Sequence, residues 1–341
     1  MTSRELVIRT LNHEPVDRIP RDLWVRSAIK RSRPDELAEM ETRFPSDIVR
    51  PDFKVPPGKR SKGKPSRKGT HTDAWGCTWH VASDGAIGTL EESPLVTVAE
   101  IAQYEPPWEI LGGINLAPIN RNCAETSRFV LAQTETRPFE RLQHLRGAEA
   151  ALADLRSGRK RIHTLLAMLH DFFCKEMELW ADSDVDGVVF CDNWGSQSGL
   201  RIAPEMWRDL FRPLYRDYCE ILHAKDKFAF FHSDGDISDI FGDLVKIGVD
   251  AIHSQLFAMK IERLAKRFRG QVTFWGEIDR QRTLPLGTVE EIREAVLRVR
   301  KALDFGSGGV IAQCEWSENV PIGNLIAAFD QWAQPLPMHA N

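Results

Sequence analysis

The chain has 341 residues, of which 42% are hydrophobic, so it can bury a large core and intrinsic disorder is not expected. Charged residues make up 28% of the chain, but the formal net charge is only −4, which excludes recruitment of nucleic acid or an anionic membrane by overall charge. A small-molecule ligand is the better expectation.

The sequence shows no segment that would direct the chain out of the cytoplasm. No stretch reaches the roughly 18 consecutive apolar residues of a membrane span, and the residues from Met1 to Arg9 are too polar for a secretory signal. The six cysteines are scattered without the paired spacing of a disulfide framework. We therefore expect a cytoplasmic protein with reduced thiols, and the sequence leaves a homodimer open.

The first third of the chain is irregular, with strands expected at residues 19–25 and 47–50. Residues 54–69 (KVPPGKRSKGKPSRKG) combine proline, glycine and cations without apolar periodicity, which is typical of a mobile insertion loop. A nucleic-acid-binding arm is the alternative. Residues 72–96 have alternating polarity around Trp75, Trp79, Gly85 and Gly88, which indicates one or two β-hairpins. These hairpins either form a lid over a site or cover the side of the fold.

From about residue 140 onward, helical and strand-like segments alternate along the chain. Apolar residues three and four positions apart predict helices at 139–156, 162–181, 204–224, 237–246 and 289–303, the last with a capping box formed by Thr288 and Glu291. Short apolar runs predict strands at 129–134, 185–191, 228–232, 251–254, 272–275 and 309–313. With the two earlier strands this makes eight. The pattern predicts an α/β fold, a single (β/α)8 barrel domain over residues 1–341 with its site at the C-terminal strand ends.

The strongest chemical signal is the strand end FAFFHSDGD at 228–236. Side chains two apart on a strand point to the same face, so His232 and Asp234 are expected to face the barrel mouth together. The last strand, within GVIAQCEW at 309–316, is expected to bring the thiol of Cys314 to the same rim. These three ligands with one open position would suit catalytic zinc. The alternative is that they serve packing or hydrogen bonding.

Two other strand ends provide candidates for proton transfer. Asp192, counted in strand period with Phe190 and Val188, is expected to face the mouth as a general acid or base. A loop cap for the helix that follows is the alternative for this carboxylate. Glu277 lies at the equivalent end of the next-to-last strand and is the second catalytic candidate, while Asp279 fits a solvated loop carboxylate better.

Five further residues near strand ends or the first strand are expected to bind substrate. They are Arg21, Arg26, Trp194, Gln197 and Gln255. The two arginines would supply cations, and the other three would supply an aromatic surface and amide groups.

Four motifs resemble the uroporphyrinogen decarboxylase superfamily, and they span nearly the whole chain. They are LNHEPVDRIP at 11–20, DNWGSQ at 192–197, HSDG at 232–235 and FWGEID at 274–279. The resemblance implies a (β/α)8 barrel and one of two chemistries, porphyrinogen decarboxylation or zinc-dependent methyl transfer involving corrinoid proteins. The decarboxylase branch carries an arginine-rich RQAGR loop near its N-terminus, which is replaced here by WVRSAIKR at 24–31.

The methyltransferase branch of the superfamily carries His-x-Cys on the fifth strand and a cysteine on the eighth as zinc ligands. His232 and Cys314 match this pattern, while Asp234 stands in place of the first cysteine. Zinc accepts a carboxylate, and oxygen in place of sulfur makes the metal a harder Lewis acid. This departure favours a methyl donor that carries its methyl group on oxygen.

We therefore expect a zinc-dependent methyltransferase or demethylase that moves a methyl group between a small methoxylated substrate and a corrinoid (cobalamin) on a partner protein. His232, Asp234 and Cys314 would hold the zinc, and Asp192 and Glu277 would orient the substrate or transfer a proton. The first alternative is a metal-free decarboxylase of a porphyrinogen or another polycarboxylate. The second is a non-catalytic barrel subunit.

Overall fold

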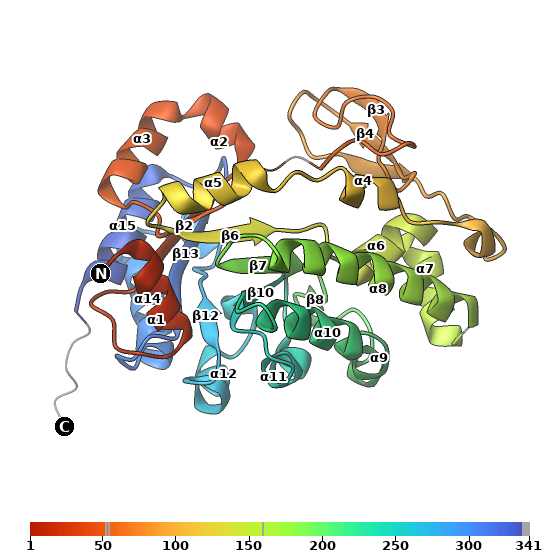
Figure 1. The fold of residues 1–341 in the computed structure, drawn as a ribbon. Helices are drawn as coiled ribbons and strands as arrows, with labels where there is room; N and C mark the ends of the chain where they lie inside the picture. The colour runs from red at the N-terminus through yellow and green to blue at the C-terminus, as the bar shows by residue number, and fades with distance from the viewer. Residues whose placement is uncertain (52, 54, 159, 336–341) are drawn as a thin grey trace.

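A computed structural model describes residues 1–51, 53, 55–158 and 160–335. Its centre is an eight-stranded parallel sheet that curves nearly into a closed barrel (Figure 1). The order of the strands is β1-β13-β12-β11-β10-β7-β6-β2. They comprise β1 (Arg21–Val25), β2 (Ile48–Val49), β6 (Phe129–Gln133), β7 (Gly187–Cys191), β10 (Phe228–Ser233), β11 (Ala251–Ser254), β12 (Thr273–Trp275) and β13 (Val310–Trp316). Each predicted strand is present, and the expected α/β barrel is confirmed.

The two end strands of the sheet meet at Asp47, which precedes β2. The backbone N–H of Asp47 donates to the carbonyl oxygen of Arg21 at 2.9 Å, and its carboxylate accepts from the backbone N–H of Arg21 at 2.8 Å. Arg18 forms an ion pair with the same carboxylate. One buried aspartate therefore joins β1 to β2 where the sheet would otherwise remain open.

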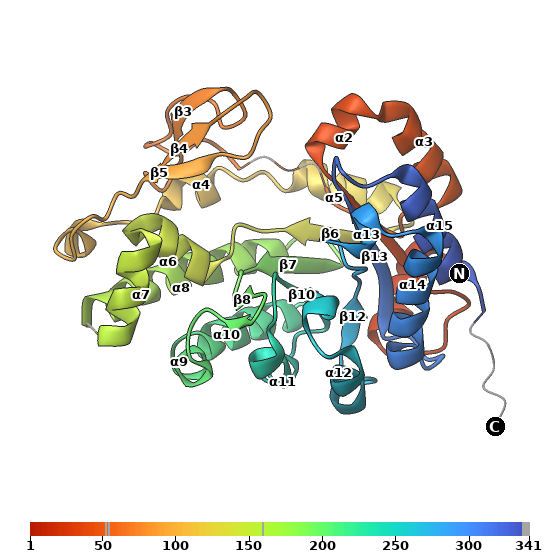
Figure 2. The same ribbon diagram turned by 180° about the vertical axis from the view of Figure 1, so that it is seen from behind.

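Helices surround the barrel on its outside, as Figures 1 and 2 show from opposite sides. They are α1 (Ser3–Leu11), α2 (Ser27–Ser32), α3 (Pro34–Arg43), α4 (Trp108–Gly112), α5 (Ala117–Glu125), α6 (Pro138–Arg146), α7 (Ala148–Ser157), α8 (Lys160–Ala181), α9 (Pro204–Leu210), α10 (Arg212–His223), α11 (Ser238–Lys246), α12 (Ile261–Phe268), α13 (Thr283–Leu286), α14 (Val289–Leu303) and α15 (Ile322–Ala333). None of the helices in the described residues is both long and apolar enough to span a membrane.

Two predicted helices are each divided in two. The segment at 139–156 forms α6 and α7, because Gly147 between them has a φ of +78°, outside the helical region. The segment at 204–224 forms α9 and α10, which meet at Phe211. Pro213 lies in the first turn of α10, where its missing N–H interrupts no hydrogen bond, but it could not lie in the interior of one continuous helix.

The core has two parts, separated by the strands themselves. Inside the barrel, apolar side chains such as Phe129, Phe230, Trp275 and Ile311 form one cluster. A larger cluster fills the layer between the outer face of the strands and the helices. Because side chains alternate along a strand, each strand contributes to both clusters, and its even and odd positions have different neighbours.

The expected hairpins form a three-stranded antiparallel sheet, β3 (Gly69–Thr72), β4 (Thr78–Val81) and β5 (Thr89–Glu92). The Trp75 ring lies 4.7 Å from that of Phe172 on α8, and the Trp79 ring lies 5.0 Å from that of His144 on α6. The sheet therefore covers α6 and α8, beside the strands of the barrel (Figure 1). In the basic insertion at 54–69, Lys62 pairs with Thr72 through its backbone, and residue 54 lies outside the described residues.

Replacing Thr288 with alanine is expected to lower the free energy of unfolding by about 1 kcal/mol. Thr288 is the N-cap of α14; its hydroxyl accepts from the backbone N–H of Glu291 at 3.3 Å, and Glu291 accepts in return at 2.7 Å. Urea unfolding of wild type and variant measures the difference. Thr288→Ser keeps the hydroxyl and is the matched control, so equal stability of all three proteins would contradict the capping role.

Candidate active site

Two histidines face each other at the barrel mouth. His232 of β10 and His253 of β11 are directly paired in register, and their Nδ1 atoms are 2.8 Å apart. The buried His253 ring stacks on Trp24 of β1 with centroids 4.4 Å apart. Burial is the largest cause that lowers the pKa of both imidazoles. Both rings are therefore neutral at pH 7, and one proton lies between the two Nδ1 atoms.

Gln313 of β13 determines which nitrogens carry protons. Its Oε1 lies 3.1 Å from Nε2 of His253, so His253 donates from Nε2 and accepts at Nδ1. His232 then donates from Nδ1, which leaves the lone pair of its Nε2 free. That nitrogen lies 3.7 Å from Oδ1 of Asp234, so both side chains reach the mouth. The arrangement presents an unprotonated nitrogen to any ligand there.

Arg280, in the loop after β12, brings three carboxylates together. Its guanidinium forms ion pairs with Asp234 and Glu315, and its Nε lies 3.8 Å from Oε2 of Glu277. Arg26 donates to Oε1 of Glu315 at 2.6 Å. The charged groups at the mouth therefore largely compensate one another.

Glu277 lies beneath these ion pairs and is only 2% exposed. Its Oε2 has no hydrogen-bond partner among the described residues and lies 3.9 Å from Nε2 of His253. Burial raises the pKa of Glu277 well above its ordinary value; Arg280 opposes this shift, and Asp234 adds to it. With Gln197 and several neighbouring residues, Glu277 lines a pocket of about 140 Å³. A carboxyl group whose protonated form is favoured by burial therefore borders a space for substrate.

One strand period deeper than Trp24, Asp22 is fully buried in the aromatic lining. It accepts from the indole N–H groups of Trp24 at 2.7 Å and Trp275 at 2.9 Å, and from both terminal nitrogens of Arg50. Arg50 also lies over the rings of both tryptophans. This saturated group holds Trp24 in place against His253.

Of the three residues expected to bind zinc, His232 and Asp234 lie together at the mouth, but Cys314 does not join them. Cys314 is fully buried in the layer between strands and helices, together with Ala312 and Trp316. Burial also raises the pKa of its thiol, which disfavours the thiolate that a metal needs. Asp234 is already paired with Arg280. In the part of the chain that the structure describes, no three His, Cys, Asp or Glu side chains are arranged to hold a metal ion.

Asp192 caps a helix instead of facing the mouth. Its carboxylate accepts from the backbone N–H groups of Phe139 at 2.7 Å and Glu140 at 2.8 Å in the first turn of α6, and from the hydroxyl of Tyr215 at 2.6 Å. The neighbouring Cys191 has the inward position on β7 and pairs in register with His232. The structure thus matches the alternative role, although the capped helix precedes Asp192 in the chain.

Of the residues expected to bind substrate, Gln197, Gln255 and Arg26 lie at the mouth. Gln197 donates to Oε1 of Gln255 at 3.0 Å, and the backbone N–H of Gly235 donates to the same oxygen at 3.0 Å. Gln255 therefore connects the loops that follow β7 and β10. Both glutamines line the pocket beside Glu277.

Trp194 and Arg21 were expected at the mouth, but they face the helix layer. Trp194 is fully buried, stacks on Phe139 at 4.0 Å and donates to Tyr215 at 2.9 Å. Arg21 lies at the start of β1, and its guanidinium lies over the ring of Phe44 near α3. Each occupies the strand or loop position whose side chain points away from the barrel axis.

Four residues at the mouth were not predicted from the sequence: His253, Arg280, Gln313 and Glu315. His253 shares a strand face with Ala251, and Gln313 and Glu315 flank the cysteine that was chosen instead. Strand period therefore offered a signal for these three residues. Arg280 lies in a loop, and nothing in its sequence surroundings marks it.

The family model of uroporphyrinogen decarboxylase (URO-D) matches residues 70–332. The chain belongs to the uroporphyrinogen decarboxylase family. No curated protein matched in a sequence search. Among solved structures of barrels, a methyltransferase from Methanosarcina mazei has a TM-score of 0.69 at 13% identity, covering 97% of this chain and 98% of its own. At that identity the similarity shows the fold alone.

A second solved structure is far less similar to this chain. It is an endo-β-1,4-xylanase from Gloeophyllum trabeum, with a TM-score of 0.48 at 9% identity, covering 96% of this chain and 99% of its own. Its resemblance carries no argument about the site.

Asp192→Asn is expected to lower the free energy of unfolding by about 1–3 kcal/mol, because the amide nitrogen would face a backbone N–H that has lost its acceptor. Turnover by the folded variant is expected to stay close to wild type. Loss of a general acid or base would instead cost about 10²- to 10⁴-fold. Urea unfolding and steady-state kinetics separate the two roles, and a loss of that size in a folded variant would show that Asp192 is catalytic.

Cys314→Ala is expected to leave the affinity for added Zn²⁺ unchanged, because the thiol faces the helix layer. Competition titration against a chelating dye measures this affinity in wild type and variant. His232→Ala serves as the comparison at the mouth. If Cys314→Ala alone weakened zinc binding by about tenfold or more, as loss of a metal-site residue does, the placement described here would be refuted.

Proposed function

We propose that this family member is an enzyme that removes a methyl group from the oxygen of a small methoxylated substrate, with Glu277 as proton donor to the leaving oxygen. The supporting observation is the buried carboxyl group of Glu277, which has a raised pKa and lines a pocket beside a pair of neutral histidines. When the carbon–oxygen bond breaks, its electron pair stays on oxygen. The proton from Glu277 neutralises that charge.

The histidine pair can return the proton to Glu277. His253 gives the proton on Nε2 to Oε2 of Glu277, takes the one on Nδ1 of His232, and His232 takes a new proton at Nε2 from the mouth. One proton enters and one leaves, so both imidazoles end neutral but in the opposite tautomers, and the tautomers must revert before Glu277 can be reprotonated by this route again. The 3.9 Å between Nε2 of His253 and Oε2 of Glu277 requires a small movement or one water molecule for transfer.

The state of the arginines favours methyl transfer over decarboxylation of a polycarboxylate. Arg26 and Arg280 are paired with Glu315 and Asp234, and Arg50 is paired with Asp22. A porphyrinogen carboxylate would have to displace these internal partners. A small uncharged substrate requires no such exchange.

The superfamily resemblance supplies the expected acceptor, a corrinoid carried by a partner protein, and the methyltransferase from M. mazei shares the fold. In the same branch, zinc would polarise the substrate heteroatom as a Lewis acid. The expected ligand set does not fit that ion here, because Cys314 faces the helices. The steps proposed above therefore use only side chains of this chain.

Glu277→Gln is expected to lower kcat by about 10²- to 10⁴-fold, the usual contribution of a general acid. The assay follows methyl transfer to free cob(I)alamin by absorbance, with a panel of methoxylated aromatic compounds as donors. Glu318→Gln, at an exposed position after β13, is the matched control and should retain wild-type activity. Wild-type activity of Glu277→Gln, or release of CO₂ from uroporphyrinogen without methyl transfer, would overturn the proposal.

The wild-type rate is expected to fall at both ends of the pH range. It falls as pH rises through the raised pKa of Glu277, because only the protonated carboxyl group donates. It also falls in acid as His232 becomes charged, and since the pKa of His232 is lowered, this limb lies below the ordinary imidazole range. A pH–kcat profile with its acid limb at or above the ordinary imidazole pKa would contradict the buried, neutral pair.

A further inference from the structure

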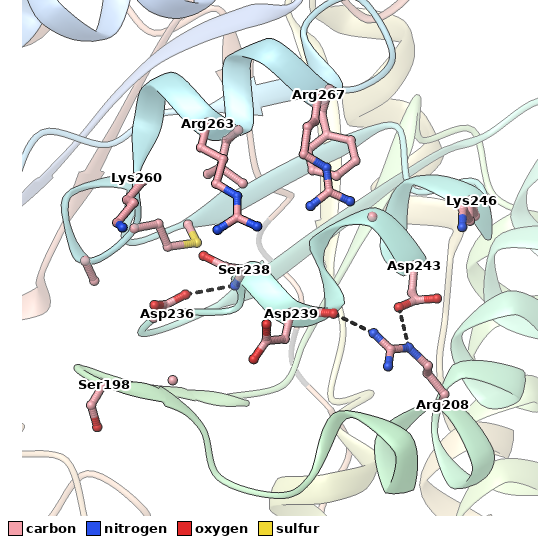
Figure 3. Close-up of a pocket in the computed structure, with 16 residues that line it drawn as sticks. Ser198, Arg208, Asp236, Ser238, Asp239, Asp243, Lys246, Lys260, Arg263 and Arg267 are labelled. Carbon is pink, nitrogen blue, oxygen red and sulfur yellow. Dashed lines mark hydrogen bonds and ion pairs between the residues drawn. The ribbon is translucent and has the colours of Figure 1, made fainter.

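A larger pocket of about 720 Å³ lies beside the barrel mouth, between α11 and α12 (Figure 3). Its remaining wall includes Ser198 and Gly199 from the short hairpin β8 (Gly195–Ser196) and β9 (Gly199–Leu200). Ala258 lines both this pocket and the smaller one next to Glu277. The volume is within the range of small-molecule sites. No step of the proposed reaction uses this space.

The pocket is rich in cations although the chain is acidic overall. Five cationic and three acidic side chains line it, whereas the whole chain has a net charge of −4. Arg208 is satisfied by Asp243 at 2.9 Å and by the carbonyl oxygen of Asp239 at 2.8 Å. The other cations have no carboxylate partner within the described ranges: Lys246, Lys260, Arg263 and Arg267.

Three of these cations form one stripe along α12, two of them within the helix and one at its N-cap. Lys260, Arg263 and Arg267 are three and four positions apart, the spacing at which side chains are neighbours on a helix. Figure 3 shows both guanidinium groups directed from α12 into the pocket, toward Ser238 and Asp239 on the opposite wall. Like charges at this spacing destabilise a helix. An anion between them would relieve that repulsion.

The rest of α12 keeps the stripe in this orientation. Leu264 and Phe268 are buried beneath the helix, and Phe268 stacks against Phe241 of α11 with ring centroids 5.1 Å apart. The two helices are thus joined at the bottom of the pocket, while the arginines remain at its entrance. A rigid floor and exposed cations at the rim are the features of a site that is formed before ligand arrives.

We propose that this pocket binds a small molecule that carries a phosphate group, with the phosphate held between Arg263 and Arg267. A guanidinium presents two parallel N–H donors that match phosphate oxygens, and phosphate carries enough charge to neutralise both arginines. The hydroxyl groups of Ser198 and Ser238 line the same space and provide further donors. Asp239, which is exposed on the opposite wall, would accept from a hydroxyl or amino group elsewhere on the ligand.

Isothermal titration with inorganic pyrophosphate, in a buffer free of phosphate and sulfate, tests the site. Wild type is expected to show saturable binding of one pyrophosphate per chain. The double variant Arg263→Ala/Arg267→Ala is expected to bind at least about tenfold more weakly, through loss of charge-assisted hydrogen bonds. Lys266→Ala, on the same helix but outside the pocket, removes one exposed charge and should bind like wild type.

Further titrations test which chemical class of ligand binds and whether it binds in this pocket or at the barrel mouth. Citrate should bind more weakly than pyrophosphate if phosphate geometry is what the arginines recognise, and Arg263→Lys/Arg267→Lys should weaken pyrophosphate binding although it keeps the charge. Glu277→Gln should bind pyrophosphate like wild type, which separates this site from the barrel mouth. Absence of saturable binding, tighter binding of citrate, or equal weakening by Lys266→Ala would overturn the proposal.

Discussion

The contact between His232 and His253 depends on the pairing register of β10 with β11, which places the two residues directly opposite each other. The same register on the other side of β10 pairs His232 with Cys191 of β7. The inward-facing side chains, which occupy alternate positions on each strand, thus form a row around the inside of the barrel. Trp275 continues this row, and its ring lies 5.6 Å from that of His253. A shift of one residue in any of these strands would turn its member of the row into the helix layer.

Strand parity also explains which features the sequence could predict. The positions of the eight strands and the bounds of α14 follow from local apolar patterns and capping residues, which the sequence shows directly. The face that each residue occupies is harder to predict, because strands buried on both sides are apolar throughout and show no polar alternation. On β13 this ambiguity led to the prediction that Cys314 faces the mouth. Gln313 and Glu315 are the residues that reach the mouth.

The same ambiguity applies at Asp192, which was predicted to face the mouth although the inward position belongs to Cys191, one residue earlier. Only the fold shows that the backbone N–H groups at the start of α6 lie where this carboxylate can accept from them. Arg280 was missed for a different reason: its partners, Asp234 just after β10 and Glu315 on β13, are far from it in sequence. Contacts of this kind depend on barrel closure, which local patterns do not encode.

Exposure divides the mouth into two electrostatic zones. His253 and Glu277 are almost fully buried, and burial favours the neutral form of both a base and an acid. Asp234 and Arg280 are closer to solvent and remain charged as a pair. A divalent cation bound at His232 and Asp234 would lie against the guanidinium of Arg280, so Arg280 would first have to leave its carboxylate partners. The position of this one arginine therefore determines whether the mouth presents its carboxylates to a cation or keeps them neutralised above the buried carboxyl group of Glu277.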